Sequence, residues 1–111
     1  MNIPHEWGDT ALILKPNGRV DGQNALDFQS AIDSTIGDSS LAVILDLSEL
    51  DYISSAGLRV ILLLAKTLRS RSVQFSMCAI SDSVKEVFEI SGFGKIIATH
   101  DSREEALATI N

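Results

Sequence analysis

The stretch that most limits the fold of this chain is "LAVILDL" at residues 41–47, which is apolar at all but one position. A strand with one face in water alternates apolar and polar residues, whereas a strand covered on both faces is apolar almost throughout. We therefore expect residues 41–47 to form an inner strand of a parallel sheet, with helices packed on both faces.

The segments around this strand alternate in period, as such a sheet requires. Apolar residues at three- and four-residue steps predict helices, and short apolar runs beside turn signals predict strands. The predicted strands are residues 3–7, 10–15, 41–47, 73–80 and 95–99. The predicted helices are residues 21–37, 56–70, 81–93 and 101–110. The first two strands are expected to form an antiparallel hairpin, with Pro4 tolerated because its strand is at the edge.

This order, ββαβαβαβα, predicts an α/β fold with a mixed, mostly parallel sheet of about five strands and about four helices. Residues 1–111 are expected to form a single domain, and the composition, 45% apolar and 22% charged, suits one ordinary core. The lone Cys78 lies in an apolar stretch and is predicted to be a small buried residue.

The charge and the apolar runs argue against several classes of function. The net charge of −6 opposes nucleic-acid binding, which uses basic patches. The longest apolar run, residues 60–65, is too short to span a bilayer, and the first residues lack the features of a signal peptide. We expect a cytoplasmic monomer with no membrane span.

The predicted helix at 56–70 is apolar almost all round, with polar residues only at Arg59, Lys66, Thr67 and Arg69 before its final serine. Either it is the best-buried helix of the fold, or it keeps part of its apolar surface for a partner. Its three basic residues fall roughly on one stripe. That stripe is either simply solvated or helps to dock an acidic or mixed partner surface.

Two adjacent serines, Ser54 and Ser55 in "YISSAG", precede this helix. If the helix begins at Ala56, Ser55 is its N-cap and its Oγ accepts from the backbone N–H of Gly57 or Leu58. Gly57 lowers helix stability, but it permits close approach by another backbone or a ligand. A hydroxyl at a helix N-terminus can also accept a phosphate, because the free N–H groups and the helix dipole favour the added charge.

Nucleophilic catalysis by either serine has little support in this sequence. A serine nucleophile needs a base and a third group that orients the base, and the chain offers only His5 and His100, in predicted edge or terminal segments. "SSAG" also differs from the nucleophile elbow "GxSxG". No metal-ligand cluster or phosphate-binding glycine loop is visible, so we expect no catalytic residue, metal or cofactor, and no enzyme activity.

Three stretches together resemble the STAS domain of bacterial anti-sigma factor antagonists. They are "GRVDGQNALDF" (18–28), "AVILDLSELDYISSAGLRVILLLAKTLR" (42–69) and "VKEVFEISGFGKII" (84–97). The resemblance covers nearly the whole chain, and the family's order of elements matches the predicted one. In that family, the serine two residues before the glycine at the start of the second helix is phosphorylated. Counting back from Gly57 gives Ser55.

The resemblance also implies partners. The family's kinase is a histidine-kinase-like ATPase that is itself the anti-sigma factor, and a serine phosphatase reverses the modification. The antagonist binds the kinase when unphosphorylated and releases it when phosphorylated. Ser54 is the second choice of phosphorylation site and stands where members often carry aspartate. Asp21 matches an aspartate of the kinase-binding surface. The partner-binding residues implied are Asp21, Ser54, Ser55, Ala56, Gly57, Leu58 and Arg59.

An alternative from another class stays open on the sequence. STAS domains also occur as accessory subunits of membrane transport complexes and as scaffold or sensor modules. Such a protein would share the fold without being regulated by phosphorylation, and the replacement of aspartate by Ser54 favours taking this alternative seriously.

Overall fold

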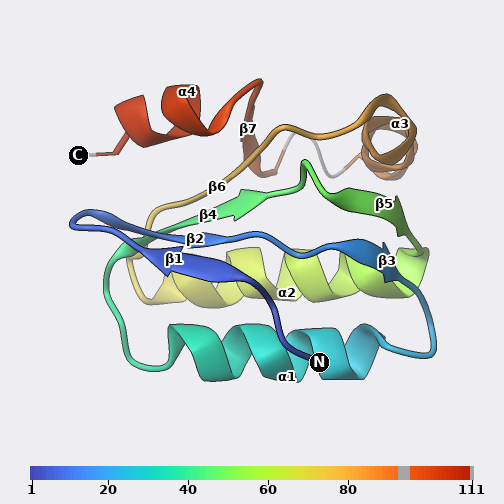
Figure 1. Ribbon diagram of the computed structural model, residues 1–111, viewed down its shortest axis with the longest axis horizontal. Helices are drawn as coiled ribbons and strands as arrows, with labels where there is room; N and C mark the ends of the chain where they lie inside the picture. The colour runs from blue at the N-terminus through green and yellow to red at the C-terminus, as the bar shows by residue number, and fades with distance from the viewer. Residues whose placement is uncertain (93–95, 111) are drawn as a thin grey trace.

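The structure is a computed structural model that describes residues 1–92 and 96–110. Its larger sheet has five strands in the spatial order β1-β2-β4-β6-β7 (Figure 1). These strands are β1 (His5–Trp7), β2 (Ala11–Leu14), β4 (Ala42–Asp46), β6 (Phe75–Cys78) and β7 (Ala98–His100). β1 pairs antiparallel with β2, and the other pairs are parallel. The predicted hairpin and the mostly parallel sheet are therefore confirmed.

β4 is the inner strand that the sequence predicts, since it pairs with β2 on one side and β6 on the other. All five of its residues are buried. Val43 and Leu45 belong to the larger hydrophobic core, whereas Ala42 and Ile44 belong to a second, smaller one. Because successive side chains point to opposite faces of a strand, one core lies on each face of the sheet.

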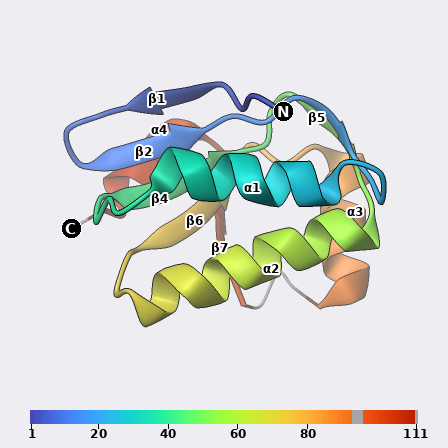
Figure 2. The same ribbon diagram turned by 90° about the horizontal axis from the view of Figure 1, so that it is seen from below.

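Helices cover the two faces unequally. The helices are α1 (Ala25–Ile36), α2 (Ser55–Ser70), α3 (Asp82–Ser91) and α4 (Arg103–Ala108). α1 and α2 lie side by side on one face, and the short α4 lies on the other (Figures 1 and 2). Within the described residues, no helix has the length and apolar character needed to cross a membrane.

α2 and α3 begin within one residue of the predicted positions, and α4 is two residues shorter than predicted at each end. The predicted start of the first helix at residue 21 is wrong: α1 begins at Ala25, because Asp21 and Asn24 hold residues 21–24 in a turn.

Ser81 accepts a hydrogen bond from Val84 N at 3.4 Å and caps α3. Ser102 accepts from Glu105 N at 3.1 Å and caps α4. α3 ends where Gly92 adopts a left-handed φ of 78°, which glycine takes without strain. Residues 93–95, where the predicted third helix ends and the next strand begins, lie outside the described residues.

Two short strands were missed by the sequence analysis. β3 (Gly18–Val20) and β5 (Leu50–Ile53) pair in parallel and form a separate two-stranded sheet. Neither strand is long enough to show a clear alternation of apolar and polar residues, and β5 carries the charged Asp51. The two strands are therefore recognised only from their pairing with each other. This small sheet lies at the end of the molecule where α1 and α2 begin, and it positions the residues discussed next (Figure 1).

Candidate functional site

The small sheet brings Asp21 and the serine pair to one edge. Val20 and Ile53 are register partners at the ends of β3 and β5. Ser54 N then donates to the carbonyl oxygen of Val20 at 2.9 Å, which closes the pairing. Because the strands are parallel, the residues that follow them, Asp21 and Ser54, leave the sheet at the same edge. The sequence had placed both in the partner-binding surface on resemblance alone.

The carboxylate of Asp21 is held by its surroundings. Its Oδ1 accepts from the backbone N–H groups of Gln23 at 2.9 Å and Asn24 at 3.3 Å, which forms the turn into α1. Its Oδ2 lies 3.3 Å from Nε of Arg19, whose guanidinium lies 4.9 Å from the ring centroid of Tyr52. The side chain of Asp21 remains 27% exposed, so this edge presents a partly exposed negative charge in a fixed position.

Ser54, and not Ser55, is the N-cap of α2. The helix begins at Ser55, one residue earlier than predicted, and Ser54 has extended backbone angles (φ −89°, ψ 173°). The Oγ of Ser54 accepts from Gly57 N at 3.3 Å, and its carbonyl oxygen accepts from Leu58 N at 2.9 Å. The expectation that Ser55 caps the helix is wrong, because β5 ends at Ile53 and Ser54 alone separates that strand from the helix.

The side chain of Ser55 is therefore left at the surface. Ser55 is exposed in the first turn of α2, and within the described part of the chain its hydroxyl makes no hydrogen bond. The first turn of α2 also carries no acidic residue. The other three helices do, at Asp27, Asp82, Glu104 and Glu105. An added negative charge on Ser55 would thus meet the positive end of the helix dipole without a carboxylate in the same turn.

Gly57 does permit a close approach, but the approaching groups are the chain's own. A Cβ at Gly57 would lie 2.7 Å from Cγ1 of Ile53 and 2.8 Å from Cγ1 of Val20. Gly57 is buried, and Leu58 is only 3% exposed, so neither presents a surface to a ligand. Both instead pack the start of α2 against the small sheet and so fix the position of Ser55.

The seven residues predicted to bind a partner thus differ in position. The exposed ones are Ser55 and Arg59; the half-buried ones are Asp21, Ser54 and Ala56; the buried ones are Gly57 and Leu58. All lie on or beside the edge where β3, β5 and the start of α2 meet, as their sequence positions and pairing require.

Comparisons with known proteins show the family of this chain. BtrV of Bordetella bronchiseptica, a candidate anti-sigma factor antagonist, is 44% identical over 108 residues, which are 97% of this chain and 93% of BtrV. Residues 3–106 match the family model of the STAS domain. The chain belongs to the STAS family of anti-sigma factor antagonists. The resemblance seen in the sequence is thereby confirmed.

Solved structures of STAS proteins have the same fold. The crystal structure of a candidate anti-sigma factor antagonist from Thermotoga maritima has a TM-score of 0.89 at 24% identity, covering 97% of this chain and 93% of that one. The anti-sigma factor antagonist SpoIIAA in its unphosphorylated form has a TM-score of 0.78 at 19% identity, covering 98% of this chain and 99% of SpoIIAA. At these identities the likeness is one of fold.

The two histidines of this STAS domain lie away from the serine pair. His5 is on β1 and His100 is on β7, at the two edges of the larger sheet. The Nδ1 of His5 is 2.8 Å from the carbonyl oxygen of Ile3. Over residues 1–92 and 96–110, no group of three or more histidine, cysteine, aspartate or glutamate side chains is placed to hold a metal ion.

Two further residues at the edge of the candidate site are not singled out by the sequence. Arg19 and Tyr52 are register partners on β3 and β5, and the guanidinium of Arg19 stacks on the ring. Tyr52 remains 45% exposed. An exposed aromatic ring with an arginine beside it is a common feature of protein interfaces. The pair becomes visible only when β3 and β5 are recognised as paired strands.

Proposed function

We propose that this STAS protein binds an anti-sigma factor that is also a serine kinase, and releases it when Ser55 is phosphorylated. The observation that carries the proposal is the different position of the two serines. Ser54 has its hydroxyl in the cap of α2, whereas Ser55 has an exposed hydroxyl on the first turn of the same helix. Ser55 therefore suits a kinase better than Ser54 does.

The names of relatives support a switch of this kind. BtrV is named as a candidate anti-sigma factor antagonist, and SpoIIAA of Bacillus is known in a phosphorylated as well as an unphosphorylated form. In the proposal, the kinase is a histidine-kinase-like ATPase and a serine phosphatase restores the unmodified chain. The STAS protein itself acts by binding and catalyses no reaction.

The physical basis of release is charge. Phosphorylation adds about −1.5 to −2 charges at neutral pH. The exposed N-terminus of α2 accommodates this charge, so the fold persists. In a complex, however, the phosphate would lie in the contact surface, at the edge where Asp21 also leaves the small sheet. Desolvating the phosphate on rebinding costs free energy and so opposes binding of the kinase.

The first test identifies which serine is phosphorylated. The histidine-kinase-like ATPase that co-purifies with the wild-type protein from its native cell is purified and incubated with the protein and ATP, and the product is analysed by mass spectrometry. We expect phosphate on Ser55 in the wild type and in Ser54→Ala, and none in Ser55→Ala. Phosphate on Ser54 alone would overturn the assignment to Ser55.

A binding titration tests the consequence of the modification. Ser55→Asp is expected to weaken binding of the kinase while leaving the melting temperature nearly unchanged. Ser54→Asp is the matched control, because aspartate is also a good N-cap residue and the charge lies one residue away. If the wild type instead co-purifies with a transport complex and never carries phosphate, the accessory-subunit alternative is favoured.

A further inference from the structure

Five side chains of α2 form a continuous row along the outside of the helix. Ser55, Arg59, Leu62, Lys66 and Arg69 recur at steps of four and three residues, which places them on one helix face. All are exposed except Leu62, which is half-buried. We call this row the α2 outer stripe. At the usual helical rise it is about 21 Å long. Figure 2 shows α2 at the margin of the molecule, beside α1.

The outer stripe is positively charged in an acidic protein. The chain has a net charge of −6, yet α2 contains Arg59, Lys66 and Arg69 and no aspartate or glutamate. None of these three cations forms an ion pair within the described residues, whereas Arg19 and Arg103 do. No ion pair within the described residues therefore satisfies the charge of the stripe, and its complement is an acidic surface.

Apolar surface accompanies the charge. Leu62 lies in the middle of the stripe, and the neighbouring Leu63 is 42% exposed. Leu63 also lines a cavity of about 240 Å³ between α1 and α2, whose lining is mixed and includes Val60 and Leu64 as well as Asp33 of α1. An apolar centre with charged residues around it is the usual composition of a protein interface, and it differs from that of a merely solvated helix face.

We propose that the α2 outer stripe binds an acidic segment of the same partner that contacts Ser55. This inference rests on the proposed function and adds the chemistry of the partner surface. The stripe begins at Ser55 itself, so a partner seated on the serine is continuous with it. A nucleic acid or a membrane would also present negative charge to the stripe. The net charge of −6 opposes binding of either large polyanion, whereas a protein segment needs to complement only the local positive charge of the stripe.

The stripe also connects phosphorylation to the acidic segment. Arg59 is four residues after Ser55, a spacing at which helix side chains meet. A phosphate on Ser55 would therefore have the guanidinium of Arg59 within reach and would pair with it. Arg59 would then no longer be available to the acidic segment of the partner, and the phosphate would repel that segment. Both the lost contact and the repulsion favour release.

Charge reversal tests the proposal. The affinity of the purified kinase is measured by calorimetric titration for the wild type, for the double variant Lys66→Glu/Arg69→Glu, and for Lys85→Glu. Lys85 is an exposed lysine on α3, off the stripe, and is the matched control. We expect the double variant to bind about 10-fold or more weakly and the control to stay within about 2-fold, with the wild-type affinity falling as salt is raised. Melting curves establish that each variant is folded.

The outcomes separate the two proposals. If Ser55→Asp weakens binding but the double variant binds like the wild type, the proposed function stands and the acidic segment is excluded. If the wild type does not bind the kinase at all, both fail. Sedimentation with phosphatidylserine vesicles and a gel shift with duplex DNA are run in parallel. The proposal would be overturned if the wild type bound the vesicles or the DNA, the double variant did not, and the two bound the kinase with equal affinity. The stripe would then bind that lipid surface or nucleic acid.

Discussion

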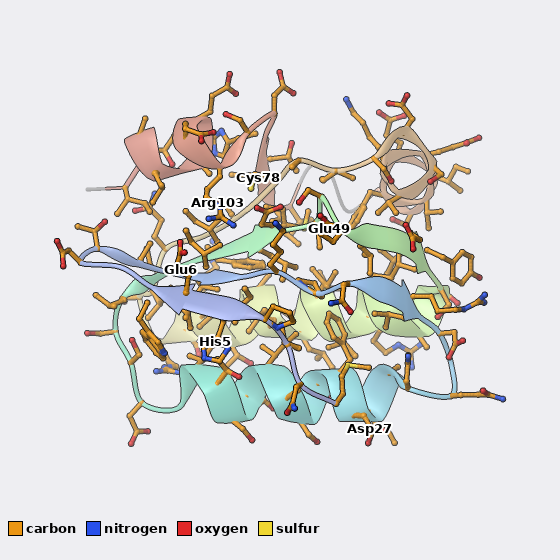
Figure 3. All side chains as sticks on the ribbon, in the orientation of Figure 1. His5, Glu6, Asp27, Glu49, Cys78 and Arg103 are labelled. Atoms are coloured by element: carbon orange, nitrogen blue, oxygen red, sulfur yellow. The ribbon has the colours of Figure 1, made fainter. Side chains whose placement is uncertain are left out.

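Arg103 and Asp46 form an ion pair that fastens α4 to the central strand of the sheet. Nη2 and Nε of Arg103 lie 3.1 Å and 3.2 Å from Oδ2 of Asp46. Nη1 of the same arginine lies 3.2 Å from Oε2 of Glu6 on β1, and Figure 3 shows Arg103 above Glu6 on the side of the sheet that α4 covers. α4 has six residues, of which only Ala106 is buried, so this pair adds to a small apolar contact.

We predict that Arg103→Ala lowers the free energy of unfolding by about 1.5–3 kcal/mol, because Asp46 is 5% exposed and would lose its charged hydrogen-bond partner. Glu6→Gln is the matched control. The side chain of Glu6 is 69% exposed, so its loss should cost less than about 1 kcal/mol. Urea denaturation of both variants gives the comparison. Equal losses of unfolding free energy would show that the buried Arg103–Asp46 pair contributes no more than the exposed Arg103–Glu6 pair.

We also predict that Asp46 contributes to acid unfolding. Burial raises the pKa of Asp46, but hydrogen bonds from Ser48 and the guanidinium of Arg103 lower it by more, so that it stays below the ordinary 3.8. A group whose pKa is lower in the folded state stabilises the fold fully above its unfolded pKa and loses this effect as pH falls through the folded pKa. Asp46→Asn should therefore be less stable than wild type at neutral pH, with the difference narrowing below about pH 4. Urea midpoints measured from pH 7 downward test this, and a constant difference would contradict it.

The sequence predicted the elements whose own residues carry a clear pattern. Residues 41–47 are apolar enough to identify the inner strand, and the period of α1 is visible in the buried Phe28 and Ile32. β3 and β5 were missed because they are three and four residues long and depend on each other, far apart in the chain. The Asp46–Arg103 pair spans 57 positions and depends on where α4 docks. No local pattern reports such a contact.

The sequence predicts which segments carry the candidate site, but not the local geometry of its residues. Two adjacent serines both fit an N-cap, and the structure separates them because β5 ends at Ile53 and Ser54 then accepts from Gly57 N. A close approach at Gly57 was predicted for another backbone or a ligand, but the approaching groups are side chains of Val20 and Ile53, on the strands that were not predicted. The basic stripe on α2 was visible in the sequence, whereas its lack of acidic partners required the structure.

The two serines are predicted to differ in their effect on stability. Ser54→Ala removes the side chain that accepts from Gly57 N and should cost about 0.5–2 kcal/mol. Ser55→Ala removes an exposed hydroxyl and should change the free energy of unfolding by less than about 0.5 kcal/mol. Thermal and urea unfolding of both variants provide the measurement. The reverse order would mean that Ser55 caps the helix in solution.

Gly57→Ala is predicted to destabilise the domain by about 1–3 kcal/mol, because the new methyl group would overlap Cγ1 of Ile53 and Cγ1 of Val20. Gly22→Ala is the matched control. A Cβ at Gly22 meets no atom within 4 Å, so this change should be neutral or slightly stabilising. Both are compared by urea unfolding. Equal stability of the two variants would show that α2 can shift away from the small sheet at no cost.

Cys78 is predicted to be unreactive in the folded protein. It is fully buried, and burial, together with the nearby carboxylate of Asp46, raises its pKa from 9.0 to about 11, against the smaller opposing effect of Arg103. Because the thiolate is the reactive form, this shift lowers the thiolate fraction about 100-fold near pH 8, in addition to the barrier of access. Iodoacetamide should label the native protein far more slowly than the urea-unfolded protein at the same pH. Asp46→Asn should leave most of this protection in place, because burial contributes more than Asp46 to the raised pKa of Cys78. Rapid labelling of the native wild type would contradict the buried position of Cys78 beneath α4.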